Sequence, residues 1–375
     1  MKVLFVFTSC KKSGPIQQML NLVKYLFEKG FAISLITIYK ESNKNDSVLE
    51  EFKKYVNHQQ IITSKFNILF LKNKKIKKII NDINPDVIHT LGVFPDYLIE
   101  KLGFKNHTFT CRNYVYEDYL DEYGFLMGNI LAKIHIKAIK NCKYVCCCSE
   151  TLSNIYLKEL NIRIPFIRNG VDTSFYSAPL FGEKERVKKE MGFNNTKKIC
   201  LYSGKFNGRK NQQFLLQNII NCKHFDDIIL LLLGDGPSFK QLKSQYKCFE
   251  NIMFLGQVFD VRKYLIASDF YISTSKSEGM PNGVLEAMSM GLPVFLSNIP
   301  QHAEILKISS KIGESYPCES SAGFINGFDN FYEKLNREMG KEASRVANLY
   351  FSYSKTGDEY IKLYDNISKG VVHGV

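Results

Sequence analysis

Short apolar runs alternate with stretches of helical spacing along most of this chain. Residues 3–7 form an apolar run without alternation, which is typical of a strand buried on both faces of a parallel sheet. Residues 16–28 carry apolar side chains three and four positions apart, which predicts a helix. Ser149 stands where it would cap a later helix. Further strands are predicted at 32–38, 86–89 and 143–148. The strand–helix–strand order favours an α/β fold with a parallel sheet.

A second series of the same kind begins near residue 197. Its clearest strand, Ile228–Leu233, consists of Ile and Leu only and is followed by Gly234-Asp235-Gly236-Pro237. The other predicted strands are 198–203, 252–255, 270–274 and 294–297, and the predicted helices are 212–221, 239–246, 261–267 and 284–290. The polar stretch 177–195 between the two series is predicted to be a linker. We therefore expect two doubly wound, Rossmann-like domains, 1–178 and 179–351, facing a central cleft at the carboxyl ends of their strands.

Composition agrees with a globular chain of two ordinary domains. The 375 residues are 45% hydrophobic and 23% charged, which excludes a disordered, collagen-like or disulfide-scaffold protein. There are 28 Phe and 21 Tyr but no Trp. The 10 Cys form no CxxC pair, so we expect reduced thiols and a cytoplasmic protein. No run approaches the ~18 apolar residues of a transmembrane helix.

The positive charge is concentrated in the first half. Lys and Arg outnumber Asp and Glu by 50 to 37 overall, by 25 to 16 in residues 1–178 and by 25 to 21 in residues 179–375. A basic amphipathic helix that can rest on anionic lipid is predicted from Lys72, Lys74, Lys75, Lys77 and Lys78, interleaved with Ile76, Ile79 and Ile80. No nucleic-acid-binding motif accompanies the charge, so no nucleic acid partner is expected.

The segment 277–288 combines two carboxylates with a helix start. Glu278 falls in the loop after a predicted strand, and Glu286 lies in the following helix. Pro281 suits the first helical position, and the free N–H groups of that turn favour an anion. The two carboxylates could anchor two parts of one extended ligand, or they could be surface glutamates.

The loop 204–210 places cations at the same edge of the predicted sheet. It contains Lys205 and Lys210 and follows the first strand of the second series. Its spacing is not that of a Walker loop, and Gly234-x-Gly236 lacks the third glycine of a dinucleotide fingerprint. These features favour a nucleotide diphosphate bound without either loop.

Four blocks, in this order, resemble the retaining glycosyltransferases of family 4, which have the GT-B fold. The blocks are Ile167–Asp172, Gly204–Lys210, Leu233–Pro237 and Glu278–Met288 together with Gly291–Val294. Ser13-Gly14-Pro15 also resembles the family's first glycine loop. The segment 352–370 resembles the closing helix, which in that family crosses back to the first domain.

The resemblance implies a role for each site residue. Glu278 would contact the transferred sugar, and Glu286 would accept hydrogen bonds from the ribose. Lys210 matches the lysine on the distal phosphate, and Lys205 stands where the family usually has Arg. Gly14 would let its loop approach the diphosphate. The backbone lining the sugar and diphosphate would be Gly279, Met280, Pro281 and Asn282.

A second departure from the family lies in the first domain. Arg112 occupies the position at which many members carry His. It would bind an anionic acceptor or an acidic sugar, or it is a salt-bridged surface residue.

The resemblance implies a retaining, metal-independent transferase without an enzymic nucleophile or a cofactor. It would move a hexose or N-acetylhexosamine from a nucleotide sugar, taken as a UDP-sugar, to a saccharide or lipid-linked acceptor. Bacterial polysaccharide, lipopolysaccharide or capsule biosynthesis is the expected setting, with the enzyme peripheral on the anionic inner face of the cytoplasmic membrane. The alternatives are a GT-B-fold sugar-nucleotide epimerase and a non-catalytic basic binding protein.

Overall fold

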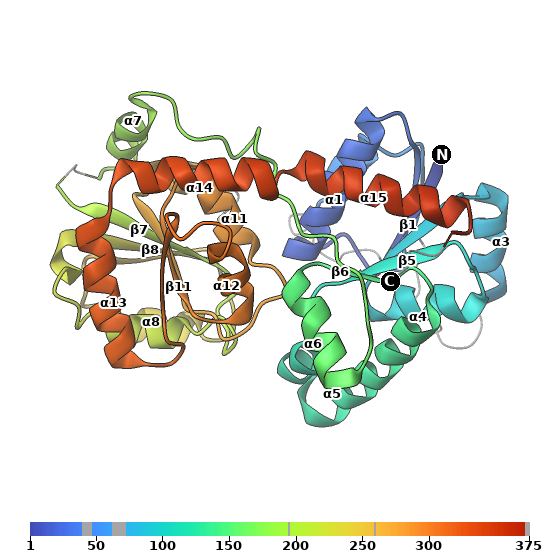
Figure 1. Ribbon diagram of the computed structural model, residues 1–375, viewed down its shortest axis with the longest axis horizontal. Helices are drawn as coiled ribbons and strands as arrows, with labels where there is room; N and C mark the ends of the chain where they lie inside the picture. The colour runs from blue at the N-terminus through green and yellow to red at the C-terminus, as the bar shows by residue number, and fades with distance from the viewer. Residues whose placement is uncertain (40–46, 62–72, 194–195, 259, 372–375) are drawn as a thin grey trace. The chain divides into compact units, whose positions relative to one another are not determined.

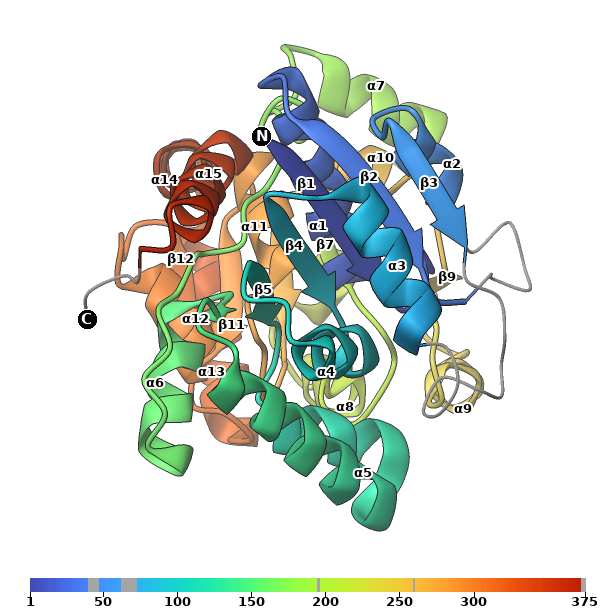
Figure 2. The same ribbon diagram turned by 90° about the vertical axis from the view of Figure 1, so that its right-hand side faces the viewer.

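The structure, a computed structural model, consists of two compact units, each built on one sheet. The described residues are 1–39, 47–61, 73–193, 196–258 and 260–371. The first unit comprises Met1–Gly170 and Tyr353–Val375, and the second comprises Val171–Ser352. Each sheet has six parallel strands, so the expected α/β fold with two doubly wound sheets is confirmed (Figures 1 and 2).

The first sheet has the strand order β3-β2-β1-β4-β5-β6. Its strands are β1 (Lys2–Phe7), β2 (Ala32–Thr37), β3 (His58–Ile61), β4 (Val87–Leu91), β5 (His107–Cys111) and β6 (Cys146–Cys147). The helices are α1 (Gly14–Glu28), α2 (Leu49–Lys53), α3 (Asn73–Ile83), α4 (Val93–Leu102), α5 (Val115–Asn141), α6 (Glu150–Leu160) and α15 (Tyr353–Ser368). Alternate residues of β1 enter different cores: Phe5 packs with α1, α2 and α15, whereas Leu4 packs with α3 and α4.

The second sheet has the order β12-β11-β10-β7-β8-β9. Its strands are β7 (Lys198–Ser203), β8 (Ile228–Leu233), β9 (Ile252–Gly256), β10 (Phe270–Ser273), β11 (Val294–Ser297) and β12 (Gly313–Tyr316). The helices are α7 (Glu183–Glu190), α8 (Gln212–Ile219), η2 (Phe225–Asp227), α9 (Phe239–Gln245), α10 (Val261–Ala267), α11 (Asn282–Ser289), α12 (Pro300–Leu306), α13 (Ser321–Lys334) and α14 (Arg337–Tyr350). Phenylalanine fills the core between α13 and the sheet, where Phe295 stacks on Phe331 with ring centroids 5.3 Å apart.

The predicted basic helix is present as α3. Ile76 and Ile80 are buried against the sheet, and the lysines occupy the exposed face. These exposed lysines are Lys74, Lys75, Lys77 and Lys78; Lys72 lies outside the described residues. Within the described part of the chain, no helix has the length and apolar character needed to cross a membrane.

Three local predictions differ from the structure. The predicted linker 177–195 contains α7 and belongs to the second unit, because Val187 supplies a buried face to an otherwise charged helix. Pro281 is the N-cap of α11 rather than its first helical residue. The strand predicted at 143–148 forms ladder pairs only at Cys146 and Cys147, since Cys148 already turns toward Ser149, which caps α6 as expected.

Helix α15 packs closely on α1 through a glycine. A Cβ atom at Gly357 would lie 2.2 Å from the ring of Tyr25. That ring is held in place because the Tyr25 hydroxyl donates to Asp358 Oδ1 at 2.6 Å. The return of the C-terminal helix to the first unit therefore depends on a residue without a side chain.

We expect Gly357→Ala to destabilise the protein. In an unobstructed helix this change would stabilise by about 1 kcal/mol, but the contact with Tyr25 should reverse the sign and cost about 1–3 kcal/mol. Urea unfolding followed by circular dichroism measures the difference, with Lys362→Ala on the exposed side of α15 as the matched control. Equal stability of Gly357→Ala and wild type would show that the Tyr25 ring gives way.

Candidate active site

The carboxyl ends of β7 and β10 bring together the two loops that carry the predicted donor residues. The strands are neighbours in the sheet, so the loop 204–210 and the loop 274–281 leave it side by side. The backbone joins them: Lys276 N donates to Arg209 O at 2.8 Å, and Thr274 Oγ1 donates to Lys210 O at 3.2 Å. Segments 64 residues apart in sequence thus form one surface.

Glu278 is a buried carboxylate surrounded by donors. Lys210 Nζ donates to its Oε1. Ser275 Oγ donates to the same oxygen at 2.7 Å, and Arg209 Nη1 lies 3.3 Å from Oε2. Arg209 Nη1 also donates to Ser277 O at 3.0 Å, so this guanidinium fixes both the carboxylate and its loop.

These donors keep Glu278 ionised. Burial alone would raise the pKa of the carboxyl group, but the charges of Lys210 and Arg209 and the hydrogen bonds from Lys210 and Ser275 outweigh it and lower the pKa to about 2. At neutral pH the site therefore presents a fixed negative charge beside two cations. Such a group accepts hydrogen bonds from hydroxyls and does not act as a proton donor.

Lys205 lies apart from this cluster. Its backbone carbonyl accepts a hydrogen bond from Gln212 Nε2 at 2.8 Å, and its side chain is exposed. None of the hydrogen bonds or ion pairs found among the described residues involves the Lys205 ammonium group. The loop thus carries one lysine committed to Glu278 and one whose charge faces solvent.

Helix α11 begins beside the same cluster. Gly283 permits its close approach to the sheet, because a Cβ atom there would lie 2.6 Å from the Tyr271 hydroxyl. Gly279, Met280, Pro281 and Asn282 form the turn into the helix, and Glu286 follows one turn later. Burial raises the pKa of Glu286 to about 7, and no cation offsets it. Near neutral pH, Glu278 is therefore fully ionised, whereas Glu286 is ionised only in part.

The first unit holds the acceptor candidate Arg112 and the donor-side candidate Gly14. Arg112 follows β5 and donates through Nη1 to Asn169 Oδ1 at 2.6 Å. Its Nε is buried and has no hydrogen-bond partner, and none of the ion pairs of the described residues includes this guanidinium. Among the described residues, Arg112 is therefore not a salt-bridged surface residue. Gly14 is the first residue of α1, directly after the N-cap Ser13.

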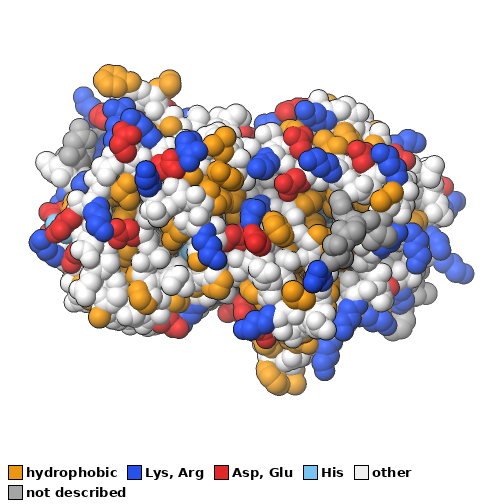
Figure 3. Space-filling model, viewed as in Figure 1, with side chains coloured by type: hydrophobic (Ala, Val, Ile, Leu, Met, Phe, Trp, Pro, Cys, Tyr) orange, Lys and Arg blue, Asp and Glu red, His pale blue; other side chains and the backbone are white. Residues whose placement is uncertain are grey.

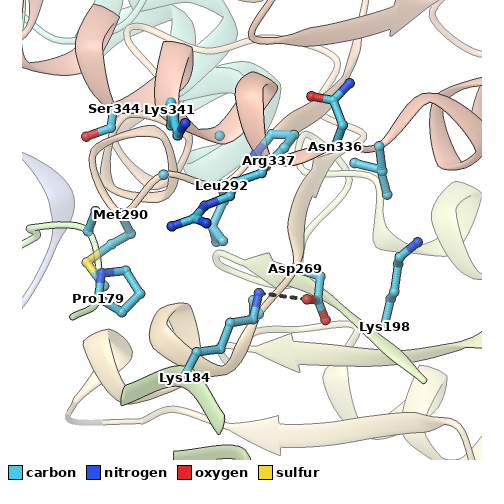
Figure 4. A pocket seen from close by; sticks show the side chains of 16 residues that line it. Pro179, Lys184, Lys198, Asp269, Met290, Leu292, Asn336, Arg337, Lys341 and Ser344 are labelled. Atoms are coloured by element: carbon cyan, nitrogen blue, oxygen red, sulfur yellow. Dashed lines mark ion pairs between the residues drawn. The ribbon is translucent and has the colours of Figure 1, made fainter. Parts of the chain in front are cut away.

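A separate cavity of about 570 Å³ opens at the opposite edge of the second sheet (Figure 4). It is lined at the amino ends of the strands by Lys198, Asp269 and Leu292, and Lys184 pairs with Asp269 at 2.6 Å. None of the predicted donor residues lines it. This cavity is not the site that the sequence predicts, which lies at the carboxyl ends.

Two family models match the chain, one in each half. The model "Glycosyltransferase Family 4" matches residues 14–175, and the model "Glycosyl transferases group 1" matches residues 183–346. Together they span most of the chain, and both sheets agree with the GT-B fold. The chain belongs to the family 4 glycosyltransferases. The resemblance drawn from the four sequence blocks is thereby confirmed.

Relatives that match most of the given chain support this assignment. The O-antigen biosynthesis glycosyltransferase WclY of Escherichia coli is 24% identical over 387 residues, covering 99% of this chain and 100% of WclY. The capsular polysaccharide biosynthesis glycosyltransferase CapH of Staphylococcus aureus is 23% identical, covering 81% of this chain and 83% of CapH.

Solved structures share the fold. Sucrose-phosphate synthase from Thermosynechococcus elongatus superposes with a TM-score of 0.82 at 16% identity, covering 99% of this chain and 100% of that one. The HepE protein of Anabaena in complex with UDP-glucose superposes with a TM-score of 0.78 at 16% identity, covering 99% of each chain.

Two members of the site were not assigned a role from the sequence. Arg209 adjoins Lys210 in the cationic loop, but only the pairing of β7 with β10 places its guanidinium against Glu278. Ser275 stands three residues before Glu278 and gives no signal by itself. A cation beside an assigned lysine is the one sequence feature that could have pointed to Arg209.

Because the pKa of Glu286 is raised, we expect Glu286→Gln to increase the stability of the folded protein, by an amount that depends on pH. The folded pKa of about 7 exceeds the unfolded value of about 4.3, so the folded state binds the proton more tightly. Stability therefore falls as pH rises from about 4.3 to 7, and the cost is complete above 7. We expect Glu286→Gln to raise Tm at pH 8 by about 2–4 °C, corresponding to about 1 kcal/mol, and to change it little at pH 4.5.

Thermal unfolding at both pH values measures this difference. Glu250→Gln, at an exposed position of the same unit, is the control and should shift Tm at neither pH. A loss of stability in Glu286→Gln at pH 8 would mean that the carboxylate is paired in the folded protein.

Proposed function

We propose that this transferase moves a hexose or N-acetylhexosamine from a UDP-sugar, with retention, to a saccharide or lipid-linked acceptor. Its setting is bacterial surface polysaccharide synthesis at the cytoplasmic face of the membrane. The names of WclY and CapH support the pathway, and the HepE complexes with UDP and UDP-glucose support the choice of nucleotide. One similar E. coli enzyme, 26% identical over 304 residues, is named a UDP-Gal:alpha-D-GlcNAc-diphosphoundecaprenol alpha-1,3-galactosyltransferase and so acts on a lipid-linked acceptor.

The observation that carries the donor site is the buried, ionised Glu278 beside Lys210 at the start of α11. A carboxylate held ionised accepts hydrogen bonds from sugar hydroxyls, and a lysine beside it attracts phosphate. The amino end of a helix adds a partial positive charge for the diphosphate. Glu286, farther along α11, would accept from the ribose hydroxyls.

Transfer on one face of the sugar needs no enzymic nucleophile. The bond between the anomeric carbon and the diphosphate oxygen breaks, and the acceptor oxygen bonds to the same face of that carbon. The acceptor hydroxyl gives its proton to the departing diphosphate. Lys210 and Lys205 stabilise the charge that develops on that diphosphate, and preorganised donors of this kind typically contribute ~10²–10³ in rate each.

The exposed charge of Lys205 suits this role, because no described side chain competes for it. Lysine supplies a point charge where arginine would supply a forked pair of donors. Three cations in one loop, Lys205, Arg209 and Lys210, offer the neutralisation that other transferases obtain from a metal ion. We therefore propose that transfer is metal-independent.

We also propose that the first unit binds an anionic membrane surface. The lysines on the exposed face of α3, Lys74, Lys75, Lys77 and Lys78, support this proposal, since each basic residue near such a surface contributes about 1 kcal/mol. A lipid-linked acceptor would be presented at that surface. No nucleic acid is expected to bind.

A thermal-shift panel tests the donor site. We expect UDP and one UDP-sugar to raise Tm, in the presence of EDTA, more than GDP or ADP and their sugars do. Lys210→Ala should abolish the shift and lower kcat by about 10²–10³-fold. Lys263→Ala, an exposed lysine of α10, is the matched control and should retain both.

Other outcomes would replace the proposal. No shift with any nucleotide on folded protein, together with salt-sensitive RNA binding, would favour a basic binding protein. Conversion of the sugar nucleotide to an isomer without acceptor would favour an epimerase. A shift lost in EDTA would contradict metal independence.

Arg112 predicts a preference for an acceptor with a negative group. We expect Arg112→Ala to raise KM for a phosphorylated acceptor by about 10–100-fold, since a hydrogen bond to a charged group contributes about 1.5–3 kcal/mol. KM for the donor should not change, and Arg112→Lys should recover part of the loss. An equal loss with a neutral saccharide acceptor would show that Arg112 only supports the fold around Asn169.

A further inference from the structure

Helix α5 is folded back on itself at Gly124. This residue has φ 74° and ψ 177° and interrupts the helix, so that 115–123 and 125–141 form two arms. The arms touch at Gly128, where a Cβ atom would lie 2.5 Å from Tyr119 O. Residues 121–127, where the chain turns, are all exposed.

A chain of polar contacts, buried at His135 and Asp96, holds the two arms together. The Tyr119 hydroxyl, on the first arm, lies 2.7 Å from His135 Nδ1 on the second. His135 Nε2 in turn lies 3.0 Å from Asp96 Oδ2 of α4, and both side chains are buried. The bend is therefore anchored to the body of the first unit and is not a loose excursion of the chain.

The bend displays apolar side chains to solvent. Phe125 and Leu126 are 77% and 79% exposed. The surrounding large side chains, which together with these two we name the α5 apex, are Tyr123, Met127 and Ile130. Figure 3 shows hydrophobic side chains protruding at the lower edge of the view, where Figure 1 places α5. Isolated exposed apolar residues are ordinary, but a protruding cluster of five marks an interaction surface.

Basic residues continue the exposed face of the second arm. Lys133, Lys137 and Lys140 follow Leu126 and Ile130 at helical spacing, and all three are exposed. At the usual helical rise, Lys133 lies about 10 Å from Leu126 along the axis and Lys137 about 16 Å. In a bilayer the phosphate groups lie outside the boundary of the acyl chains. An apolar tip with lysines about 10–16 Å behind it has the same order of apolar and charged groups.

Acidic residues stand on the other arm of the bend. Asp121 and Glu122 precede Tyr123 and are exposed. Attraction to anionic lipid must therefore come from the lysines of the second arm and of α3. Helix α3 packs on the same face of the sheet as α4, which in turn packs against α5. Figure 2 shows the three helices together, with α4 between α3 and α5.

We propose that the α5 apex inserts into the acyl boundary of the bilayer, while the lysines of α3 and of the second α5 arm contact the lipid phosphates. This insertion rests on the membrane binding proposed above and specifies how the first unit contacts the bilayer. Two independent terms then govern binding: apolar insertion at the apex, which salt does not screen, and attraction through the lysines, which salt does screen.

The absence of Trp from the chain permits a direct test. Phe125→Trp creates a protein with a single tryptophan at the apex. With vesicles of phosphatidylcholine and phosphatidylglycerol we expect its emission to shift to shorter wavelength and to be quenched by lipids brominated on the acyl chains. Phe181→Trp is the matched control, because Phe181 is 104% exposed but lies in the second unit; its emission should not change.

A second pair of variants separates the two terms. Phe125→Ser combined with Leu126→Ser should weaken sedimentation with vesicles at least tenfold at both low and high salt. Replacing Lys74, Lys75, Lys77 and Lys78 by Gln should weaken it only at low salt and only with anionic lipid. All variants should keep the wild-type Tm and the UDP thermal shift, since none of these residues belongs to the donor site.

Unchanged Phe125→Trp emission with vesicles that sediment the protein would overturn the proposal. So would a wild-type dimer that the Phe125→Ser and Leu126→Ser changes convert to monomer without weakening vesicle binding, because the apex would then be a contact between two copies. Failure of the transferase proposal is seen separately, as loss of the UDP shift in wild type.

Discussion

A charge buried in a protein must be paired, and this requirement organises the second unit around Glu278. The carboxylate lies in a loop after β10, yet two of its donors, Arg209 and Lys210, come from the loop after β7. Ionisation is possible only because these strands are neighbours. The charge of Glu278 therefore depends on the loop conformations, and these depend on the order of the strands. If one cation were lost, the carboxylate would gain a proton or draw water into the site.

The same physics makes the two glutamates different. Glu278 is surrounded by cations and has a pKa of about 2, whereas Glu286 is half-buried, and desolvation alone raises its pKa to about 7. One is a fixed anion and the other changes charge near neutral pH. A ribose hydroxyl can donate to either form of Glu286, but the ionised form accepts more strongly. In the roles proposed above, the constant charge would serve the sugar and the variable charge would serve the ribose.

Much of this fold could be predicted from apolar runs and helical spacing, because parallel strands buried on both faces leave a strong signal. Ile228–Leu233 and Val261–Ala267 have the predicted bounds. The short edge strand at Cys146 and the small buried face of α7 left weaker signals, and the linker prediction failed there. The paired glutamates and the lysines of the loop 204–210 stand out by their place at the predicted sheet edge, and the resemblance supplied the role expected of each. Arg209, Ser275 and the pKa of Glu286 follow from contacts between distant segments, which a single sequence does not record.

The bend in α5, unlike the buried strands, leaves no clear signal in the sequence. Gly124 and Gly128 do not by themselves reveal this bend, since single glycines are tolerated within helices. What ends the first arm is the combination of positive φ at Gly124 with the close packing at Gly128 and the Tyr119–His135–Asp96 chain. The positive φ, the close backbone contact and the buried polar groups are each unfavourable unless the other two are present. This polar chain, in which His135 and Asp96 are buried, fixes one geometry. That geometry keeps the apolar side chains of the apex in water, and they are stabilised only when a second apolar surface covers them.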